Sequence, residues 1–453
     1  MKRFLLITMA FPPKGAVGAL RTYRLCRYLP ELGWLPEVIT THPWGTVNRD
    51  CTLLEEIHED IRIHRTKLID PVMAWQRRGA AASTGEATVS AAPAAAGPSG
   101  TGDAAPSRPS LIGRLKLTLI GLVSTPDHMV FWNLHLLARG WKILRRNRDI
   151  AFIITSTPPH SSLIAGTLLG RIFGLPHVLD LRDPWAGRYW GEHSALRRRV
   201  ERWLQRWVIR RAARVISTTE GYTRMARELF PGCPAEKFVT ITNCFEPEKF
   251  DRIEPVRRDT FTICYLGIFY PVYEPYAFFT ALRLWFERNP GVRSDVELLV
   301  VGNCDPATRK VLRENGLEDR LTVTGRIAHE RAIAEAKSAD LLLLLMGTND
   351  KVPRHWLPAK LFEYLACGKP ILAYGRDEEA LAIIRDAGAG HPLTSAEPEG
   401  FIAVLDREYR VWKSGGREAR QDRARGTIET YTSDHTNRQF ADLFDDVSAD
   451  PCS

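Results

Sequence analysis

Short apolar runs separated by longer amphipathic segments constrain the fold of this chain more than any other feature. Each run is rich in Val, Ile and Leu and lacks the apolar–polar alternation of a strand with one face in water. Such runs are typical of strands buried on both faces, as in a parallel sheet covered by helices. The expected strands form two series, Phe4–Met9, Glu37–Thr40, Phe152–Thr155, His177–Asp180, Val215–Thr218 and Phe238–Ile241, and then Phe261–Leu266, Val296–Val301, Leu321–Thr324, Leu341–Met346 and Ile371–Tyr374.

Helical patterns lie between these runs, at Ala19–Leu32, Ser161–Phe173, Tyr276–Arg288, His329–Ser338 and Ala359–Cys367. Strand–helix alternation predicts parallel sheets with right-handed crossovers. A polar, Pro-containing stretch at 251–259 separates the two series, and one very wide sheet is disfavoured. We therefore predict an α/β protein of two doubly wound, Rossmann-like domains at 1–252 and 258–415. A helical segment at 416–453 is a candidate to pack back on the first domain.

Residues 79–110 carry almost nothing that a hydrophobic core could use. All but four of these 32 residues are Gly, Ala, Ser, Thr or Pro. Ordering such a stretch would cost conformational entropy without burying apolar surface. We expect a disordered insertion in a surface loop of the first domain.

The composition, 44% hydrophobic and 25% charged, excludes collagen-like and wholly disordered chains. The eight cysteines contain no C-x-x-C pair, which favours reduced thiols over a disulfide framework or a zinc site. No apolar run reaches the roughly 18 residues that a spanning helix needs. The opening Met1–Ala10 is better interpreted as a buried strand than as a signal peptide. These features predict a soluble, cytoplasmic protein.

The net charge of +9 is concentrated in Arg-rich segments. Leu196–Arg214 contains eight Arg and an apolar stripe at helical spacing. A core-packed helix with solvated Arg and a helix resting on anionic lipid both fit this pattern. A second candidate for lipid contact is Leu111–Val123 with the basic, aromatic Phe131–Arg148. Nucleic-acid binding is disfavoured, because no RNA- or DNA-binding motif accompanies the charge.

Ligands of open parallel sheets bind beyond the carboxyl ends of the strands, so the loops after strands hold the first candidates. Gly15 and Gly18 follow the first strand and allow close approach to a ligand at a helix start, although a plain strand–helix turn is equally open. His160 follows the third strand, where it faces the ligand edge or caps its own helix. Residues 180–185 (DLRDPW) form a charged cluster in which buried Asp–Arg pairing is the simpler interpretation.

The most specific element is a helix in the second half, 357–372 (LPAKLFEYLACGKPIL). Pro near its start, Gly at its end and Pro after it define a short helix that leads into a buried strand. Lys360 and Glu363 are three residues apart and therefore share one face. They are placed to meet a diphosphate and a sugar hydroxyl, with a simple surface ion pair as the alternative.

This P-x-K-x-x-E-Y-x-A-x-G-K-P-I-L pattern resembles the donor-site helix of GT-B glycosyltransferases, specifically the retaining family-four group of bacterial polysaccharide and lipid-glycan transferases of the cell envelope. The resemblance covers nearly the whole chain outside the insertion. Its further motifs, in order, are the FPP strand end with its Gly loop, STPPHS, DLRDPW, Ile241–Phe245, Tyr265–Gly267, Val323–Arg326 and Ala339–Leu343.

The resemblance implies a nucleotide-diphosphate-sugar donor held by the second domain, with the acceptor on the first and a cleft between the two. By analogy Glu363 takes the ribose hydroxyls and Lys360 the diphosphate. The Gly15–Gly18 loop lies near the diphosphate and sugar, and His160 approaches the sugar. The implied acceptor is a glycan or a lipid-linked glycan, reached at the inner face of the cytoplasmic membrane.

Two positions depart from the family pattern. His355 stands where many relatives carry a second Glu near the sugar, which makes His355 a candidate for catalytic work. After the first strand of the second domain many relatives have an Arg and a Lys that hold the phosphates, whereas this chain has Gly267 followed by neither. We therefore expect Lys360 and Arg326 to neutralise the leaving group.

The chain contains no D-x-D motif, so we expect a metal-independent site without a cofactor, in which Lys and Arg replace a divalent ion. Fixed cations act most strongly where negative charge develops on the leaving diphosphate. For retaining enzymes of this type the resemblance implies same-face attack assisted by that phosphate. Two other functions remain open, namely a nucleotide-sugar epimerase or hydrolase of the same fold and a non-catalytic binding paralogue.

Overall fold

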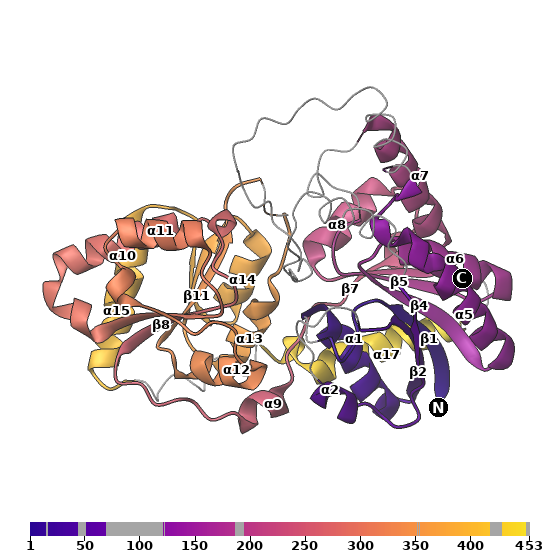
Figure 1. Ribbon diagram of the computed structural model, residues 1–453, viewed down its shortest axis with the longest axis horizontal. Helices are drawn as coiled ribbons and strands as arrows, with labels where there is room; N and C mark the ends of the chain where they lie inside the picture. Colours follow the sequence, from indigo (N-terminus) through magenta and orange to yellow (C-terminus); the bar gives the residue numbers. More distant parts are fainter. Residues whose placement is uncertain are drawn as a thin grey trace, which may run out of the picture. The chain divides into compact units, whose positions relative to one another are not determined.

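The computed structural model describes residues 1–14, 17–43, 51–68, 121, 123–185, 194–350, 352, 354–416 and 428–449. Within it the chain divides into two compact units. The N-terminal unit comprises Met1–Thr242 and the chain from Asn437 onward, and the C-terminal unit comprises Asn243–Thr436. Figure 1 shows a twisted sheet with helices on both faces in each unit. The predicted insertion 79–110 lies outside the described residues.

The described strands of the N-terminal unit form a parallel seven-stranded sheet in the order β3-β2-β1-β4-β5-β6-β7. The central β1, β4 and β5 are almost completely buried, which explains their continuous apolar sequences. The bounds are β1 Lys2–Thr8, β2 Trp34–Thr41, β3 Ile63–Thr66, β4 Ile150–Thr157, β5 His177–Leu181, β6 Arg214–Ser217 and β7 Phe238–Thr240.

Helices cover both faces of this sheet (Figure 1). On one face α5 and α6 pack over Leu5, Ile7 and Ile153. The bounds in this unit are α1 Val17–Tyr28, α2 Thr52–Glu55, α5 Trp132–Arg146, α6 Ser161–Phe173, α7 Ala195–Arg211 and α8 Glu220–Leu229. The expected helix 19–32 ends early as an α-helix because Pro30 begins a tighter 3-10 turn, Leu29–Leu32.

The C-terminal unit repeats the design with a parallel six-stranded sheet, again among the described strands, in the order β10-β9-β8-β11-β12-β13. Its strands are β8 Phe261–Leu266, β9 Val296–Val301, β10 Leu321–Val323, β11 Leu341–Gly347, β12 Ile371–Gly375 and β13 Gly390–Leu393. Its helices are α9 Pro247–Arg252, α10 Tyr276–Arg288, α11 Pro306–Glu314, α12 His329–Ser338, α13 Ala359–Cys367, α14 Glu378–Asp386 and α15 Pro398–Lys413. The predicted architecture of two Rossmann-like α/β domains is confirmed.

The division between the units falls at Thr242 and Asn243, about ten residues before the expected joint. Packing gives the reason, because Phe245 and Phe250 of the intervening segment are buried in the core of the C-terminal unit. Near the other end of the chain, α17 (Ser433–Ala449) contributes Phe440 and Phe444 to the core of the N-terminal unit. The Phe444 ring lies 4.7 Å from that of Phe152.

Among the described residues, no helix combines the length and the apolar character needed to cross a membrane. None of their seven cysteines forms a disulfide bond.

Candidate functional site

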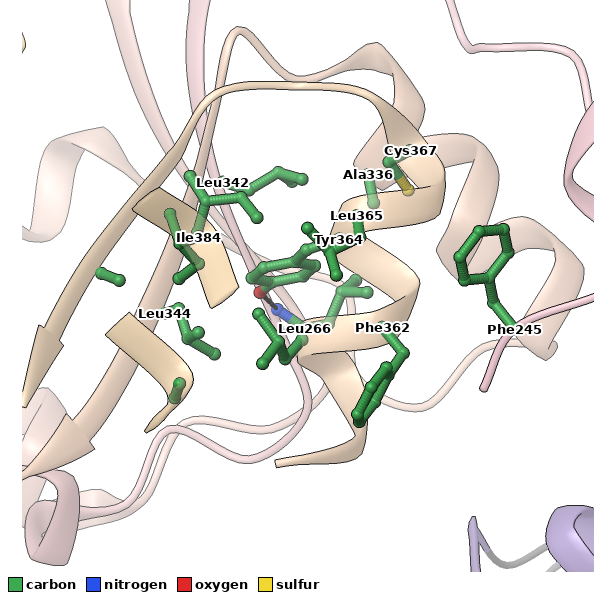
Figure 2. Close-up of a cluster of buried hydrophobic side chains, with 14 of the residues drawn as sticks. Phe245, Leu266, Ala336, Leu342, Leu344, Phe362, Tyr364, Leu365, Cys367 and Ile384 are labelled. Carbon is green, nitrogen blue, oxygen red and sulfur yellow. Dashed lines mark hydrogen bonds between the residues drawn. The ribbon is translucent and has the colours of Figure 1, made fainter. Parts of the chain in front are cut away.

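Helix α13 is fixed to the sheet of the C-terminal unit by one buried tyrosine. Tyr364 is fully buried, and its hydroxyl accepts a hydrogen bond from Leu266 N (2.9 Å) and donates one to Leu343 O (3.1 Å). Figure 2 shows this contact within the apolar cluster between α13 and the strands. The helix ends at Gly368, whose left-handed backbone (φ 66°) suits glycine. The first turn of α13 is thereby held at the carboxyl end of β8.

Lys360 projects from that first turn into an aromatic environment. Its Nζ lies 3.7 Å from the centre of the Tyr265 ring and 5.6 Å from that of Tyr273. It also donates a long hydrogen bond (3.4 Å) to Leu266 O. Burial lowers the pKa of Lys360 to about 7, although the Glu363 carboxylate acts in the opposite direction. In the described part of the chain, no carboxylate forms an ion pair with this ammonium group.

Glu363 pairs with a histidine and not with Lys360, the partner that a simple surface ion pair would give it. Its carboxylate pairs with Nε2 of His329, the first residue of α12, at 2.9 Å. The alternative of a Lys360–Glu363 surface ion pair is therefore wrong. Lys360 and Glu363 both lie near the start of α13, but they do not pair with each other, so each could contact a ligand separately.

The loops after β8 and β9 are shaped by two glycines. Gly267 has φ 103° and Gly302 has φ 138°, both in the left-handed region that favours glycine. A Cβ on Gly302 would lie 2.2 Å from Gly267 O, so the two loops touch backbone to backbone. Arg326 follows β10 and is exposed, and nothing in the described part of the chain pairs with it. Gly267, Arg326, Lys360 and Glu363 thus lie on segments next to the carboxyl edge of one parallel sheet.

His355 precedes α13 and is partly buried, with a backbone φ of 62°. A non-glycine residue in this region is uncommon, and such strain concentrates at functional sites. A second network ties the neighbouring loops together, since Glu274 accepts hydrogen bonds from the backbone and hydroxyl of Thr348. These hydrogen bonds lower the pKa of Glu274. No structural feature assigns His355 a chemical step, and its catalytic role stays a prediction.

In the N-terminal unit, the glycine loop borders a partly buried arginine, Arg182. Gly15 lies outside the described residues. Gly18 is in the first turn of α1, and a Cβ there would lie 2.5 Å from a terminal nitrogen of Arg182. Arg182 donates hydrogen bonds to the carbonyl oxygens of Gly18 and Thr157. Gly18 therefore makes room for a guanidinium group, and its contact with a donor stays a prediction.

Asp180 of the DLRDPW cluster belongs to a buried Asp–Arg pair, as the simpler interpretation of that cluster predicts. Asp180 is fully buried and forms an ion pair with Arg21 at 2.9 Å. Ser156 Oγ donates a further hydrogen bond to it at 2.6 Å. Arg21 also donates to the carbonyl oxygens of Ile241 and Thr242. This network joins α1, β4, β5 and the end of β7.

His160 does not cap its own helix. Asp127 performs that task, because it accepts hydrogen bonds from the backbone and hydroxyl of Ser161. The buried His160 ring stacks on Trp185 with 5.7 Å between ring centres, and its Nε2 lies 3.3 Å from Asp183 O. A carbonyl oxygen only accepts, so Nε2 carries the hydrogen. Burial lowers the pKa of His160 and keeps the ring neutral at pH 7.

The Arg-rich segment forms α7, whose exposed face carries both apolar and basic side chains. Leu196 and Trp203 are 53% and 63% exposed, although their spacing placed them in the predicted core stripe. They alternate along one helix face with exposed arginines, and the helix packs through other residues. The exposed set is Leu196, Arg199, Trp203, Arg206 and Arg210, and the buried set is Gln205, Val208 and Ile209.

Two residues of these surroundings, Tyr265 and Tyr273, were not among the predicted site residues. The Tyr265–Gly267 motif was the available signal for the first, whereas no motif singles out Tyr273, and only the fold brings both rings to Lys360. The DLRDPW motif indicated Arg182, but only the structure shows its contact with Gly18.

Residues 18–244 match the glycosyl transferase 4-like domain, and residues 260–408 match the glycosyl transferases group 1 domain. No curated protein matches the sequence.

The fold is similar to those of several solved structures. Sucrose-phosphate synthase from Thermosynechococcus elongatus is 14% identical, with a TM-score of 0.61 over 99% of this chain and 100% of that chain. The lipopolysaccharide outer core galactosyltransferase WaaB, in its apo form, is 13% identical, with a TM-score of 0.57 over 98% and 99%. Trehalose 6-phosphate synthase from Burkholderia multivorans is 11% identical, with a TM-score of 0.60 over 99% of both.

At these identities the likeness to solved structures establishes the fold alone. The match to the glycosyl transferase 4-like domain, by contrast, spans half of the chain. It is followed by the group 1 domain over most of the C-terminal unit. The chain therefore belongs to the glycosyltransferases that join a glycosyl transferase 4-like domain to a group 1 domain in the GT-B fold.

Proposed function

We propose that this glycosyltransferase moves a hexose from a nucleotide-diphosphate-sugar to a glycan or lipid-linked acceptor, with retention and without a metal ion. The observation that carries the donor assignment is Lys360. Its ammonium group lies at the start of α13 with no carboxylate partner among the described residues. A cation held in this way, next to a helix N-terminus, suits a bound anion.

The chemistry of the leaving group fits this arrangement. Breaking the anomeric C–O bond leaves negative charge on the diphosphate, and a preorganised cation lowers the barrier where that charge develops. Lys360, assisted by the exposed Arg326, supplies the positive charge in the proposal. Glu363 accepts hydrogen bonds from the ribose hydroxyls, and the neutral His160 contacts the transferred sugar.

Transfer assays test the function against its two alternatives. The full-length protein is incubated with nucleotide sugars, with and without an envelope glycan acceptor, and released nucleotide and product are measured. Sugar transfer only with acceptor supports a transferase. Acceptor-independent hydrolysis or epimerised donor supports the second enzyme class, and tight donor binding without turnover supports a binding paralogue.

Retention and metal independence need separate measurements. The anomeric configuration of donor and product, read by NMR, decides retention. Activity that persists after exhaustive chelation supports a site in which Lys and Arg take the place of a divalent ion. Loss of activity that Mg²⁺ or Mn²⁺ restores would contradict it.

We further propose that the protein acts at the inner surface of the cytoplasmic membrane, through α7 and the Leu111–Arg148 region. The exposed face of α7 alternates Leu196 and Trp203 with Arg199 and Arg206, the residue types that bind anionic interfaces. Of the second predicted segment, 111–120 and 122 lie outside the described residues. In the same unit, α5 exposes Trp141 and Leu134.

Vesicle sedimentation tests this surface. Binding to vesicles with anionic lipid should weaken as salt rises and should fall strongly in Arg199→Gln/Arg206→Gln and in Trp203→Ala. Arg252→Gln/Arg257→Gln, at exposed arginines of the C-terminal unit, is the matched control and should bind like wild type. Equal binding by all variants, or no binding at low salt, would reject the proposal.

A further inference from the structure

The ammonium group of Lys360 is held by aromatic rings in place of a carboxylate. Tyr265, under its Nζ at 3.7 Å, is fully buried and stacks on Phe269 with 4.3 Å between ring centres. Tyr273 lies on another side at 5.6 Å and stacks nearly parallel on Trp356, at 5.9 Å and 7°. Each ring is thus fixed by a second ring behind it.

Three separate segments build this environment. Tyr265 is the penultimate residue of β8, Tyr273 ends the short 3-10 helix Pro271–Tyr273, and Lys360 is in the first turn of α13. The Tyr364 hydroxyl locks α13 to the end of β8. The ammonium is therefore placed on the rings by the fold and not by a flexible side-chain encounter.

Rings hold a cation less firmly than a carboxylate does. A cation over an aromatic ring is stabilised only modestly, whereas removal from water favours the neutral amine. In this protein burial prevails and lowers the pKa of Lys360 to about 7. A bound diphosphate would reverse the balance, because nearby negative charge favours the ammonium.

The other charged groups around Lys360 do not replace that anion. Glu363 on the same helix raises the pKa of Lys360, but it is paired with His329 of α12. On α9, which also packs against α13, Lys249 pairs with Glu246 and Arg252 with Glu248. Burial raises the pKa of both Tyr265 and Tyr273, which keeps these two neighbours neutral.

We infer that Tyr265 and Tyr273 are positioning residues that hold the Lys360 side chain over their rings, so that the donor diphosphate and a proton are taken up together. This inference rests on the proposed donor site. The proton comes from the buffer and adds to the lone pair of the neutral Nζ, and no covalent bond to the ligand forms. Donor binding then weakens above neutral pH, far below the range where an exposed lysine loses its charge.

Calorimetry on the full-length protein tests the coupling directly. UDP, GDP and ADP are titrated at pH 8.5 in two buffers of different ionisation enthalpy, where the terminal phosphate (pKa about 6) is already ionised. We expect uptake of roughly one proton for each nucleotide bound, and an affinity about 20-fold lower at pH 9 than at pH 7.5. Lys360→Arg, whose guanidinium stays charged, should bind without proton uptake.

A pair of Tyr273 variants tests the rings. Tyr273→Phe keeps the ring and should behave like wild type. Tyr273→Ala admits water to Lys360, which moves its pKa toward that of an exposed lysine, so the proton uptake should fall by at least half. Thermal melts across the same pH range show whether each variant is folded.

The outcomes separate the inference from the proposed function. Nucleotide binding without proton uptake in wild type, or equal uptake in Lys360→Arg, overturns the inference and leaves the donor site standing. Unchanged uptake in Tyr273→Ala overturns the role of its ring. If none of the three nucleotides binds at pH 6.5, where Lys360 is charged, the proposed function fails and the inference fails with it.

Discussion

The two Rossmann-like units differ in which groups contact the cationic side chains at the carboxyl edges of their sheets. In the N-terminal unit, Arg21 is buried against Asp180, and Arg182 donates hydrogen bonds to two backbone carbonyl oxygens. In the C-terminal unit, Lys360 rests on aromatic rings and Arg326 is exposed without a carboxylate partner among the described residues. The same topology therefore uses its charges to hold loops in one unit, whereas in the other we propose that they serve a bound ligand.

The largest expected effect comes from breaking a pair in the N-terminal unit. Asp180→Asn leaves the buried Arg21 without its counter-charge, which should cost about 3–5 kcal/mol in the free energy of unfolding. Asp445→Asn is the matched control, because its pair with Lys2 is more than half exposed and should contribute about 0–1 kcal/mol. Urea unfolding measures both. Equal losses would mean that the buried pair does not hold the loops.

Lys360→Met should show the opposite behaviour, with activity lost and the fold kept. The methionine keeps the apolar stem and removes the charge, so the melting temperature should stay close to that of wild type. If the charge meets the leaving diphosphate, kcat/KM should fall 10²–10³-fold, about 2.7–4 kcal/mol. Lys310→Met, at an exposed lysine of the same unit paired with Glu314, should transfer sugar at the wild-type rate. Wild-type activity in Lys360→Met would refute the donor-site assignment.

A buried histidine gives the N-terminal unit its own pH dependence. His177 lies between the hydroxyls of Thr155 and Thr167, and burial lowers its pKa from 6.5 to about 3. Between pH 6.5 and about 3, this histidine takes up a proton in the unfolded chain but not in the folded chain. Stability is therefore full above pH 6.5 and is lost as the pH falls toward 3, by about 2 kcal/mol between pH 7 and 5. In His177→Gln, urea unfolding should show a flatter pH dependence, and an unchanged slope would assign the acid sensitivity elsewhere.

Glu363→Gln should have a smaller effect, and mainly on donor affinity. The amide keeps the shape but accepts weaker hydrogen bonds than a carboxylate, so the donor KM should rise about tenfold with little change in kcat. Replacing its partner in His329→Ala should raise the KM less, because the carboxylate remains. His355→Ala is measured alongside them. A large fall in kcat there would show that His355 works near the sugar, and a larger KM effect at His329 than at Glu363 would argue against ribose binding.

The smallest effect is expected from shortening residues 79–110 to a brief Gly/Ser linker. Loop length changes stability only slowly, by about 0.6 kcal/mol for each doubling. Melting temperature and transfer rate should both stay near wild type. A large loss of either would show that the N-terminal unit depends on this segment.

Strands buried on both faces were predicted most accurately, and the partly exposed edge strands β7 and β10 were also predicted. β8 and β9 begin and end at the residues expected from the sequence. The edge strands β3 (Ile63–Thr66) and β13 (Gly390–Leu393) were missed, because both are partly exposed and their sequences IHRT and GHPL carry no continuous apolar run. Edge strands owe their pairing to a neighbour, and a single sequence does not show that neighbour.

At the site, motifs indicated which residues to examine but not what they contact. Lys360 and Glu363 were identified because their spacing on one helix is local information. The partners are remote, since Glu363 pairs with His329 and Lys360 lies on Tyr265, 95 residues earlier. His160 shows the same limit, because the residue that caps its helix is Asp127. Only the tertiary structure shows whether the His160 side chain caps its helix or packs elsewhere.

The placement of α17 has a consequence for how the chain matures. Phe4 in the first strand packs against Phe444, so synthesis of the whole C-terminal unit comes between the two halves of one core. The N-terminal unit leaves the ribosome first but cannot complete this core until α17 has been made. A chain that terminates early would therefore present an apolar gap beside Phe4, Trp34 and Phe152, a surface suited to chaperone capture and proteolysis.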